Sequence, residues 1–325
     1  MVKLAIIGAG QLGGRHLQAL ALIDRKARIQ VVDTSPASLE LAKARFCEVH
    51  GSGNVQDVEL HKSINDLWDD LDLVIVATNA NVRSMVVEEL LHTKKTKYII
   101  LEKVLFQKLK DYTAIAELLK SKKVKSWVNC PKRIWPFYQQ LKEKFKGVEK
   151  VEYNVSGSDL GIGCNAIHYI DNLAFLIGQD QFTFFNDQLD PDTISSKRAG
   201  FIEFTGTLQG ITDKRSRISI SSYNGGDAPL IIQIKSEKVR CLIMEDQGRA
   251  LVSEKENNWI WQEVNFTVPY QSQLTHIVVQ EILDTEKCDL PDFNEAAKLH
   301  VPMLETLIKH LQKECSGEKE ICPIT

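Results

Sequence analysis

Three short segments combine side chains that can carry or exchange protons. Glu102 and Lys103 directly follow a predicted strand at residues 97–101. Arg133 and Trp135 stand in a second segment, which pairs basic with aromatic residues. A lysine in a desolvated cleft is a suitable general acid or base, because burial and neighbouring cations lower its pKa. We therefore take Lys103 as a candidate for proton transfer.

The third segment opens an apolar helix and carries Asn165, His168, Asp171 and Asn172. Spacings of three and four residues place Asn165, His168 and Asn172 on one helix face, with Asp171 beside them. Histidine exchanges protons near neutral pH, and Asp171 could fix its tautomer or bind a hydroxyl group. Each of these features alone is more often a local surface contact, so the prediction depends on their combination.

A glycine motif stands close to the start of the chain. Gly8, Gly10 and Gly13 form G-x-G-x-x-G between an apolar run at residues 3–7 and a helical stretch that continues to Leu20. In such a motif the first glycine allows a tight turn, the second lets a pyrophosphate approach the backbone, and the third lets helix and strand pack closely. The helix amino terminus then faces the phosphates. The motif predicts a dinucleotide site.

A second apolar run, residues 29–32, ends at Asp33, about 20 residues beyond the glycines, where a carboxylate would bind the adenosine ribose. A carboxylate there repels a 2′-phosphate, and no arginine follows it directly. We therefore expect NAD as the cofactor, with NADP as the alternative because Lys43 or Arg45 could reach across. The predicted cofactor contacts are Gly8, Gly10, Gln11, Leu12, Gly13, Asp33, Thr78, Asn79, Glu102 and Lys103.

Strand and helix patterns alternate in the first part of the chain, which predicts a parallel sheet covered by helices on both faces. Strands are expected at 3–7, 29–32, 72–78, 97–101 and 126–129, and helices at 84–92 and 111–120. The later part predicts strands at 200–207, 216–223, 230–236 and 240–245, and helices at 273–284 and 294–311. We expect a Rossmann domain at residues 1–127 and an α+β domain with a mainly antiparallel open sheet at 128–325.

Composition narrows the function classes. The net charge of −3 and the lack of a basic tract argue against nucleic-acid binding. No apolar run is long enough to span a membrane, and a strand starts at once, so we expect no signal peptide and a cytoplasmic protein. The seven cysteines form no C-x-x-C pair, and no metal site is predicted. Residues 315–325 are expected to be a surface extension.

Taken in order, these motifs resemble the glucose–fructose oxidoreductase / inositol dehydrogenase (Gfo/Idh/MocA) family. The resemblance covers most of the chain, and only its first motif is common outside the family. It rests on G-x-G-x-x-G-x-x-H from Gly8 to His16, Ala77-Thr78-Asn79, Glu102-Lys103-Val104, R-x-x-P-x-Y from Arg133 to Tyr138, and H-x-x-D from His168 to Asp171.

The resemblance implies an NAD(P)-dependent oxidoreductase of sugars, sugar derivatives, sugar nucleotides or cyclitols. It implies that Lys103 and His168 flank the reacting carbinol, where we expect them to share the proton work. It also implies a homodimer or homotetramer formed through the C-terminal sheet. The predicted substrate contacts are Lys103, Arg133, Trp135, Asn165, His168 and Asp171.

The chain departs from the family pattern at two positions. Val104 stands where a proline usually follows the E-K pair, so the backbone around Lys103 is expected to be less rigid. Cys164 stands where many relatives carry an aspartate, four residues before the histidine. The neighbouring Asn165 cannot act as a base near neutral pH, which leaves Lys103 as the better candidate.

Two other functions remain open. One is an imine or other non-sugar reductase on the same fold, with which the cysteine at position 164 is compatible. The other is a non-catalytic, dinucleotide-binding regulator, a class that the fold also includes. Such a regulator would keep the glycines and Asp33 without needing acid/base groups, so the presence of both Lys103 and His168 favours the enzyme.

Overall fold

The computed structural model describes residues 1–314 and 320–325 and divides into two compact units. The first unit comprises Met1–Phe106, Lys110–Pro131 and Pro269–Asn294. The second comprises Gln107–Leu109, Lys132–Val268 and Glu295–Thr325. The sequence predicted a single boundary between residues 127 and 128, whereas residues 269–294 also belong to the first unit. This could not be predicted, because the sequence of an amphipathic helix does not indicate which sheet it will cover.

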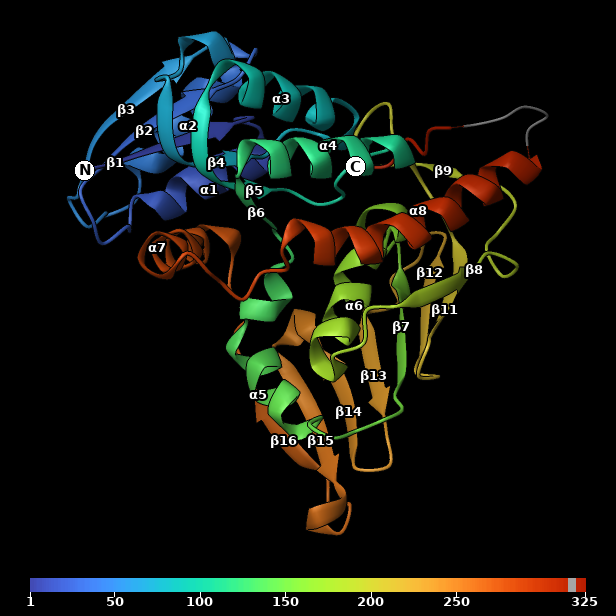
Figure 1. Ribbon diagram of the computed structural model, residues 1–325. Coiled ribbons are helices and arrows are strands. Elements are labelled where there is room, and N and C mark those ends of the chain that lie inside the picture. Colours follow the sequence, from blue (N-terminus) through green and yellow to red (C-terminus); the bar gives the residue numbers. More distant parts are fainter. Residues whose placement is uncertain (315–319) are drawn as a thin grey trace. The chain divides into compact units, whose positions relative to one another are not determined.

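The first unit is built on a six-stranded sheet with the order β3-β2-β1-β4-β5-β6, in which all neighbours are parallel (Figure 1). Its strands are β1 (Val2–Ile7), β2 (Ala27–Val32), β3 (Val55–His61), β4 (Asp70–Val76), β5 (Lys95–Leu101) and β6 (Lys125–Val128). The carboxyl ends of β1 and β4 are buried, as expected for parallel strands covered on both faces. This order is that of a Rossmann sheet, in which ligands bind at the carboxyl ends of the strands where the order reverses, here between β1 and β4.

Helices connect and cover these strands. They are α1 (Gln11–Leu20), α2 (Pro36–Cys47), η1 (Ile64–Asp66), α3 (Ala80–Thr93), α4 (Leu109–Lys122), η5 (Gln271–Gln273) and α7 (Thr275–Thr285). The segment η5–α7, which is distant in sequence, packs on α1, the helix that follows the glycine motif. The predicted Rossmann fold of the N-terminal part is therefore confirmed, and a further helix is supplied from beyond residue 269.

The second unit contains an eight-stranded sheet with the order β16-β15-β14-β13-β7-β12-β11-β8. Its strands are β7 (Glu152–Ser158), β8 (Phe182–Phe185), β11 (Gly206–Thr212), β12 (Arg217–Tyr223), β13 (Ile231–Lys235), β14 (Val239–Met244), β15 (Arg249–Glu254) and β16 (Gln262–Asn265), and a separate pair is formed by β9 (Ile194–Ser195) and β10 (Ile202–Glu203). Only the β7–β12 pairing is parallel, so the predicted mainly antiparallel sheet is confirmed.

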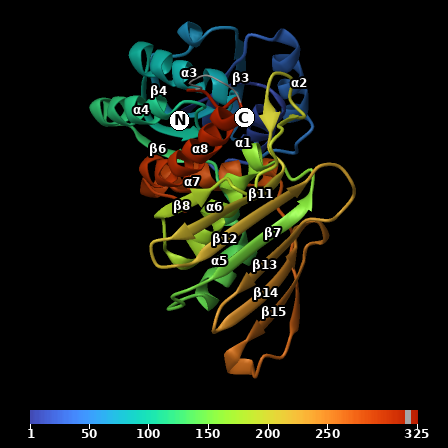
Figure 2. The same ribbon diagram turned by 90° about the vertical axis from the view of Figure 1, so that its right-hand side faces the viewer.

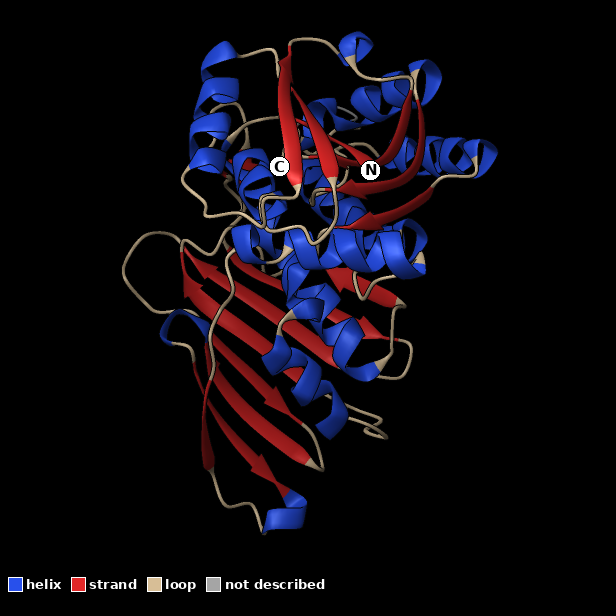
Figure 3. Ribbon diagram, turned by 90° about the vertical axis from the view of Figure 1, so that its left-hand side faces the viewer, coloured by secondary structure: helices blue, strands red, loops and turns tan. Residues whose placement is uncertain are grey.

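The helical elements of the second unit are η2 (Pro131–Ile134), α5 (Pro136–Lys144), α6 (Ile162–Ile177), η3 (Glu245–Gln247), η4 (Lys255–Asn257) and α8 (Phe293–Glu314). Helices α5 and α6 lie over one face of the large sheet (Figure 3). Alternate residues of β7 and β12 are buried beneath them. The other face carries no helix among the described residues of this unit (Figure 2).

Two predictions for this part of the chain are wrong. The predicted strand 200–207 is divided, because Gly206 takes a φ of +82° and its backbone lies against residues 188–190. The predicted surface extension is wrong for the last residues, since Cys322 and Ile324 are fully buried and bonded to Gln107. Residues 315–319 of that extension lie outside the described residues.

Candidate functional site

The three motif glycines meet different surroundings at the carboxyl end of β1. Gly8 has a φ of +97°, and a Cβ there would lie 2.8 Å from the carbonyl carbon of Ala77. A Cβ on Gly13 would lie 1.8 Å from the Gly8 oxygen, whereas one on Gly10 would meet no atom within 4 Å. The fold itself therefore requires Gly8 and Gly13. Gly10 leaves open space at the amino terminus of α1, where a pyrophosphate would approach.

The first backbone N–H groups of α1 face this space. Gln11 and Leu12 are its first residues, and Gly10, at the N-cap, supplies no side chain to cap them. Such groups have no partner inside their own helix and carry its positive dipole end. Their direction and charge suit a phosphate, as predicted for Gln11 and Leu12.

Asp33 is held beside the glycine turn. One carboxylate oxygen accepts a hydrogen bond from the Ala9 N–H at 2.6 Å, and the other accepts one from the Ser35 N–H at 2.8 Å. Each oxygen keeps a further lone pair, so the carboxylate can still accept a ribose hydroxyl. The predicted ribose ligand is therefore positioned by the turn that it would serve.

Thr78 and Asn79 follow β4, the neighbour of β1. The hydroxyl oxygen of Thr78 is buried and has no hydrogen-bond partner among the described residues. Asn79 precedes α3 as its N-cap residue but makes no side-chain capping bond. Both side chains thus retain unused hydrogen-bonding capacity beside the glycine turn, which fits their predicted contact with the cofactor.

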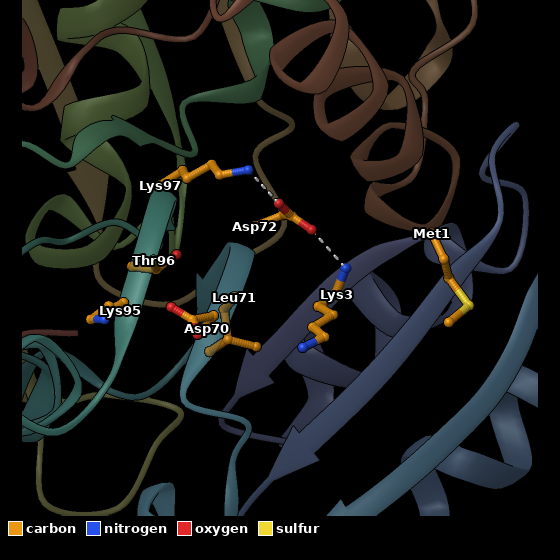
Figure 4. Close-up of a pocket in the computed structure, with 8 residues that line it drawn as sticks. All are labelled: Met1, Lys3, Asp70, Leu71, Asp72, Lys95, Thr96 and Lys97. Carbon is orange, nitrogen blue, oxygen red and sulfur yellow. Dashed lines mark hydrogen bonds and ion pairs between the residues drawn. The ribbon is translucent and has the colours of Figure 1, made fainter.

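A separate hollow of about 430 Å³ lies at the opposite edge of this sheet (Figure 4). Its lining comes from the amino ends of β1, β4 and β5, where Asp72 accepts from the Lys3 N–H at 3.0 Å and pairs with Lys97 at 2.8 Å. Its charged groups are thus partly paired, and it lies away from the strand ends at which this fold binds nucleotides.

A buried network surrounds Glu102 at the end of β5. Its Oε1 accepts hydrogen bonds from His16 at 2.9 Å and from the side-chain amide of Asn129 at 2.5 Å. His16 also contacts the Thr275 hydroxyl at 2.8 Å, and Gln271 bonds both Thr275 and Asn129 at 2.9 Å. The five side chains close a ring that links α1 to the ends of β5 and β6 and to η5–α7.

Donors can be assigned for most of these contacts. The Asn129 amide donates to Glu102 and Gln271, Gln271 donates to the Thr275 hydroxyl, and the Nε2–H of His16 donates to Glu102. The Thr275 hydroxyl donates to the Gln271 carbonyl at 3.3 Å and also contacts Nδ1 of His16. Burial alone would raise the pKa of Glu102, but the hydrogen bonds and charges around it, chiefly those of His16, lower it. Glu102 is therefore an ionised anchor beside Lys103.

Lys103 is partly exposed and directly follows this anchor. Its peptide bond to Val104 is cis. The buried guanidinium of Arg83 donates to the carbonyl oxygens of Val104, Leu105 and Thr78, with 3.0 Å to Leu105. The expected looseness around Lys103 is thus countered by Arg83, which ties the loop to the end of β4.

In the second unit, α6 is buried along almost its whole length. The only residues of this helix that keep partial exposure are Cys164, Asn165, His168 and, at its far end, Ile177. The first three lie at spacings of one, three and four residues, so they form one accessible stripe on the amino-terminal half. The Asn165 amide donates to the Leu160 carbonyl at 2.6 Å. The stripe presents a histidine imidazole as its acid/base group.

Arg133 and Asp171 bind each other in the interior of this unit. Nε and Nη2 of Arg133 make three contacts of 2.7–3.0 Å with the Asp171 carboxylate, and Nη1 reaches Glu295 at 2.8 Å. Burial would lower the pKa of Arg133, but the two carboxylates raise it; burial raises the pKa of Asp171 to about 6 against the effect of Arg133. Their contact with a substrate stays a prediction.

Trp135 is also buried, and its indole N–H has no hydrogen-bond partner among the described residues. Its ring lies 4.7 Å from the ammonium of Lys132, which pairs with Glu245. The sequence singled out the segment of Lys132 without assigning it a role, and it gave no signal for Glu245 or Arg83. Glu245 is more than 100 residues from Lys132 and Tyr138, and Arg83 is 21 and 22 residues from Val104 and Leu105, so only the fold shows these pairings.

Residues 2–130 match the model of the Gfo/Idh/MocA oxidoreductase family with an NAD-binding Rossmann fold. This match bears out the predicted resemblance to that family and the expectation of NAD as the cofactor. No curated protein matches the chain with significant sequence similarity.

Solved structures share the fold over almost the whole chain. UDP-N-acetylglucosamine 3-dehydrogenase from Acidithiobacillus ferrooxidans is 13% identical, with 94% of this chain and 96% of that one covered and a TM-score of 0.69. Levoglucosan dehydrogenase in complex with NADH is 14% identical, with 96% and 97% covered and a TM-score of 0.69. A super-repressor mutant of Gal80p from Saccharomyces cerevisiae is 15% identical, with 96% of each chain covered and a TM-score of 0.72. At these identities the likeness establishes the fold.

Two further features concern the described residues, 1–314 and 320–325. None of the helices there has the length and apolar character needed to cross a lipid bilayer. The same residues contain no group of three or more histidine, cysteine or acidic side chains arranged to hold a metal ion.

Proposed function

We propose that the protein is an NAD-dependent dehydrogenase or reductase that moves a hydride between the nicotinamide and a carbinol or carbonyl carbon of a sugar, sugar derivative or sugar nucleotide. The observation that carries this proposal is the family-matched unit, in which the accessible Lys103 follows the buried, ionised Glu102 at the sheet edge where this fold binds nucleotides. A regulator needs the glycine turn but has no need of a positioned lysine.

The glycine turn, Asp33, Thr78 and Asn79 would hold the dinucleotide in this proposal. Bound NAD supplies the acceptor or donor of the hydride. Hydride transfer at a carbinol also requires the hydroxyl oxygen to lose or gain a proton, so a group on the protein must exchange it. We assign this work to Lys103 and His168, each of which is an accessible acid/base group in its own unit.

The two residues contribute in different ways. The ammonium of Lys103 can donate a hydrogen bond to the substrate oxygen and stabilise negative charge that develops there. The imidazole of His168 can accept the proton during oxidation and return it during reduction. Asn165 is assigned to a substrate hydroxyl, because its amide oxygen still has accepting capacity after its N–H bonds Leu160.

The first test is the absorbance of reduced nicotinamide, followed with sugars, anhydrosugars, sugar nucleotides and cyclitols. NAD and NADP are run separately and in both directions, with Lys103→Met, His168→Ala and the exposed α4 variant Lys110→Met as a control. We expect turnover in the wild type and in Lys110→Met, and its loss in the first two variants. Full turnover in both Lys103→Met and His168→Ala would overturn the assignment, and dinucleotide binding without turnover would favour a regulator.

We also propose a cytoplasmic homodimer or homotetramer formed through the helix-free face of the large sheet. That face includes the β8, β11 and β12 residues around a shallow hollow of about 430 Å³, and Phe185 at its rim is 45% exposed. Light scattering of the wild type and of Phe185→Glu tests this. A dimer or tetramer that the variant dissociates is expected, and a monomeric wild type would contradict the proposal.

A further inference from the structure

Two adjacent basic residues of η2, Lys132 and Arg133, reach opposite flanks of the helix that carries His168. At about 100° per residue along an α-helix, Asp171 lies on one side of His168 and Tyr169 on the other. Arg133 bonds Asp171, and the Lys132 ammonium lies 5.1 Å from the Tyr169 ring centroid. We propose that Lys132 and Arg133 clamp α6 and fix its rotation about its own axis, which makes them positioning residues for His168. The inference rests on the proposed function.

The Arg133 arm of the clamp is rigid. Its planar guanidinium engages both oxygens of Asp171 and, through Nη1, the Glu295 carboxylate on α8. Asp171 and Arg133 have only 1% and 5% of their surface exposed. A fork of this kind fixes direction as well as distance, which a lysine cannot do. Helix α6 is therefore held to η2 and α8 one turn beyond His168.

The Lys132 arm works through a carboxylate and three aromatic rings. The Lys132 ammonium pairs with Glu245, and Glu245 also accepts a hydrogen bond from the Tyr138 hydroxyl. The same ammonium lies 4.7 Å from the ring centroid of Trp135 and 5.4 Å from that of Tyr138. Burial lowers the pKa of Lys132, and the Glu245 charge opposes this. A buried ammonium with one carboxylate and several ring faces has little freedom to move.

A further hydrogen bond secures α6 on the Tyr169 flank. The Tyr153 hydroxyl of β7 donates to the Asn172 side-chain oxygen at 2.9 Å. Asn172 lies one turn after His168 and is completely buried. The predicted common face of Asn165, His168 and Asn172 is thus divided, since Asn165 keeps partial exposure and Asn172 is bonded to the sheet.

Removing either cation should disturb the rotation of the helix. A carboxylate that loses its partner in this interior gains by moving towards water. The accessible stripe of Cys164, Asn165 and His168 is the side of α6 that water reaches, and Asp171 lies next to it on the helix surface. A helix without its Arg133 contact would therefore turn Asp171 towards the stripe and displace His168.

The test compares Lys132→Met and Arg133→Met with Lys142→Met. Lys142 is a matched control, because its ammonium also contacts α6, 3.9 Å from the Phe175 ring centroid, but away from His168. The His168 ring signal is followed by NMR in histidine-labelled protein and identified with His168→Gln. We expect one sharp signal in the wild type and in Lys142→Met, and a doubled or broadened one in the two clamp variants.

Turnover supplies the second readout. A displaced acid/base group lowers kcat more than it alters KM, so we expect kcat to fall about tenfold or more in each clamp variant with KM changed less than about threefold. Arg133→Lys and Lys132→Arg, which keep the charge, replace any methionine variant whose circular dichroism shows that it does not fold. A single sharp His168 signal in folded variants at both positions overturns the clamp. If no substrate turns over, the proposed function fails while the NMR result still decides on the clamp.

Discussion

The hydrogen bond between His16 and Glu102 is expected to hold much of the structure around Lys103. His16 has 1% of its surface exposed and Glu102 has 2%, so water cannot replace either partner without opening the fold. His16→Ala removes the donor 2.9 Å from the Glu102 carboxylate and leaves Thr275 without its histidine contact. Asn129 remains as a donor to the same oxygen.

The size of the effect follows from these contacts. A hydrogen bond to a charged group contributes about 1.5–3 kcal/mol, and breaking a buried charged pair by removing one partner costs about 3–5 kcal/mol. Because Asn129 still stabilises the carboxylate, we expect the coupling between His16 and Glu102 to be about 2 kcal/mol. In a unit of this size, the loss of about 2 kcal/mol of unfolding free energy lowers Tm by about 4–8 °C.

A double-mutant cycle measures this coupling directly. Urea unfolding of the wild type, His16→Ala, Glu102→Gln and the double variant gives the interaction free energy, and the exposed α3 variant His92→Ala serves as a control. We expect His92→Ala to leave the unfolding free energy within about 0.5 kcal/mol of the wild type. A coupling below about 0.5 kcal/mol would refute the view that the pair acts as one buried unit.

Three further predictions concern the same unit. The pKa of Glu102 is lower in the folded protein than in the unfolded chain, where it is about 4.3. The ionised side chain therefore stabilises the fold above about pH 4.3, and this contribution is lost as the pH falls through the lower folded pKa. The urea midpoints at neutral and acid pH should differ less in Glu102→Gln than in the wild type. Gly10→Ala should lower the affinity for NAD about tenfold or more, measured by calorimetry, while Tm stays unchanged. Gly13→Ala should lower Tm strongly, because its Cβ would lie 1.8 Å from the Gly8 oxygen. Equal losses of Tm in the two variants would contradict this. Asp33→Ser should weaken NAD binding more than NADP binding, and an unchanged ratio of the two affinities would exclude a ribose contact.

Local sequence was sufficient for the nucleotide-binding sheet. A strand, a glycine turn and a helix follow one another within 20 residues. Gly13 packs against Gly8, which is close in sequence, and Gly8 packs against Ala77 and Thr78 at the end of the adjacent strand. Asp33 could be placed for the same reason, because parallel strands end at a common edge. Short-range patterns specify short-range geometry.

Long-range pairing could not be predicted in the same way. Arg133 and Asp171 were predicted as substrate contacts, which stays a prediction, but their pairing with each other and with Glu295, more than 120 residues further along the chain, was not predicted. Nothing in the spacing of these residues shows that they will meet. The same holds for Gln271 and Thr275, which complete the network around Glu102 from a segment predicted to lie in the other domain.

The buried tail shows a second kind of contact that the sequence did not predict. Cys322 and Ile324 follow a short polar stretch of the sequence, residues 316–320, that is typical of an exposed end, yet Ile324 lies against Gly163 at the start of α6. A Cβ on Gly163 would come within 2.6 Å of an Ile324 methyl group. The burial of such a segment depends on the packing of elements that are distant in sequence. A local sequence pattern therefore does not predict it.

The proposed function requires that a hydride be transferred to or from NAD at a carbinol carbon. This transfer can be measured with the substrate found in the panel, deuterated at that carbon, by following the mass of the nicotinamide formed. We expect the reduced nicotinamide to gain one deuterium in the wild type, and none to be transferred by Lys103→Met. Reduced nicotinamide without the label, or deuterium released into water, would contradict it.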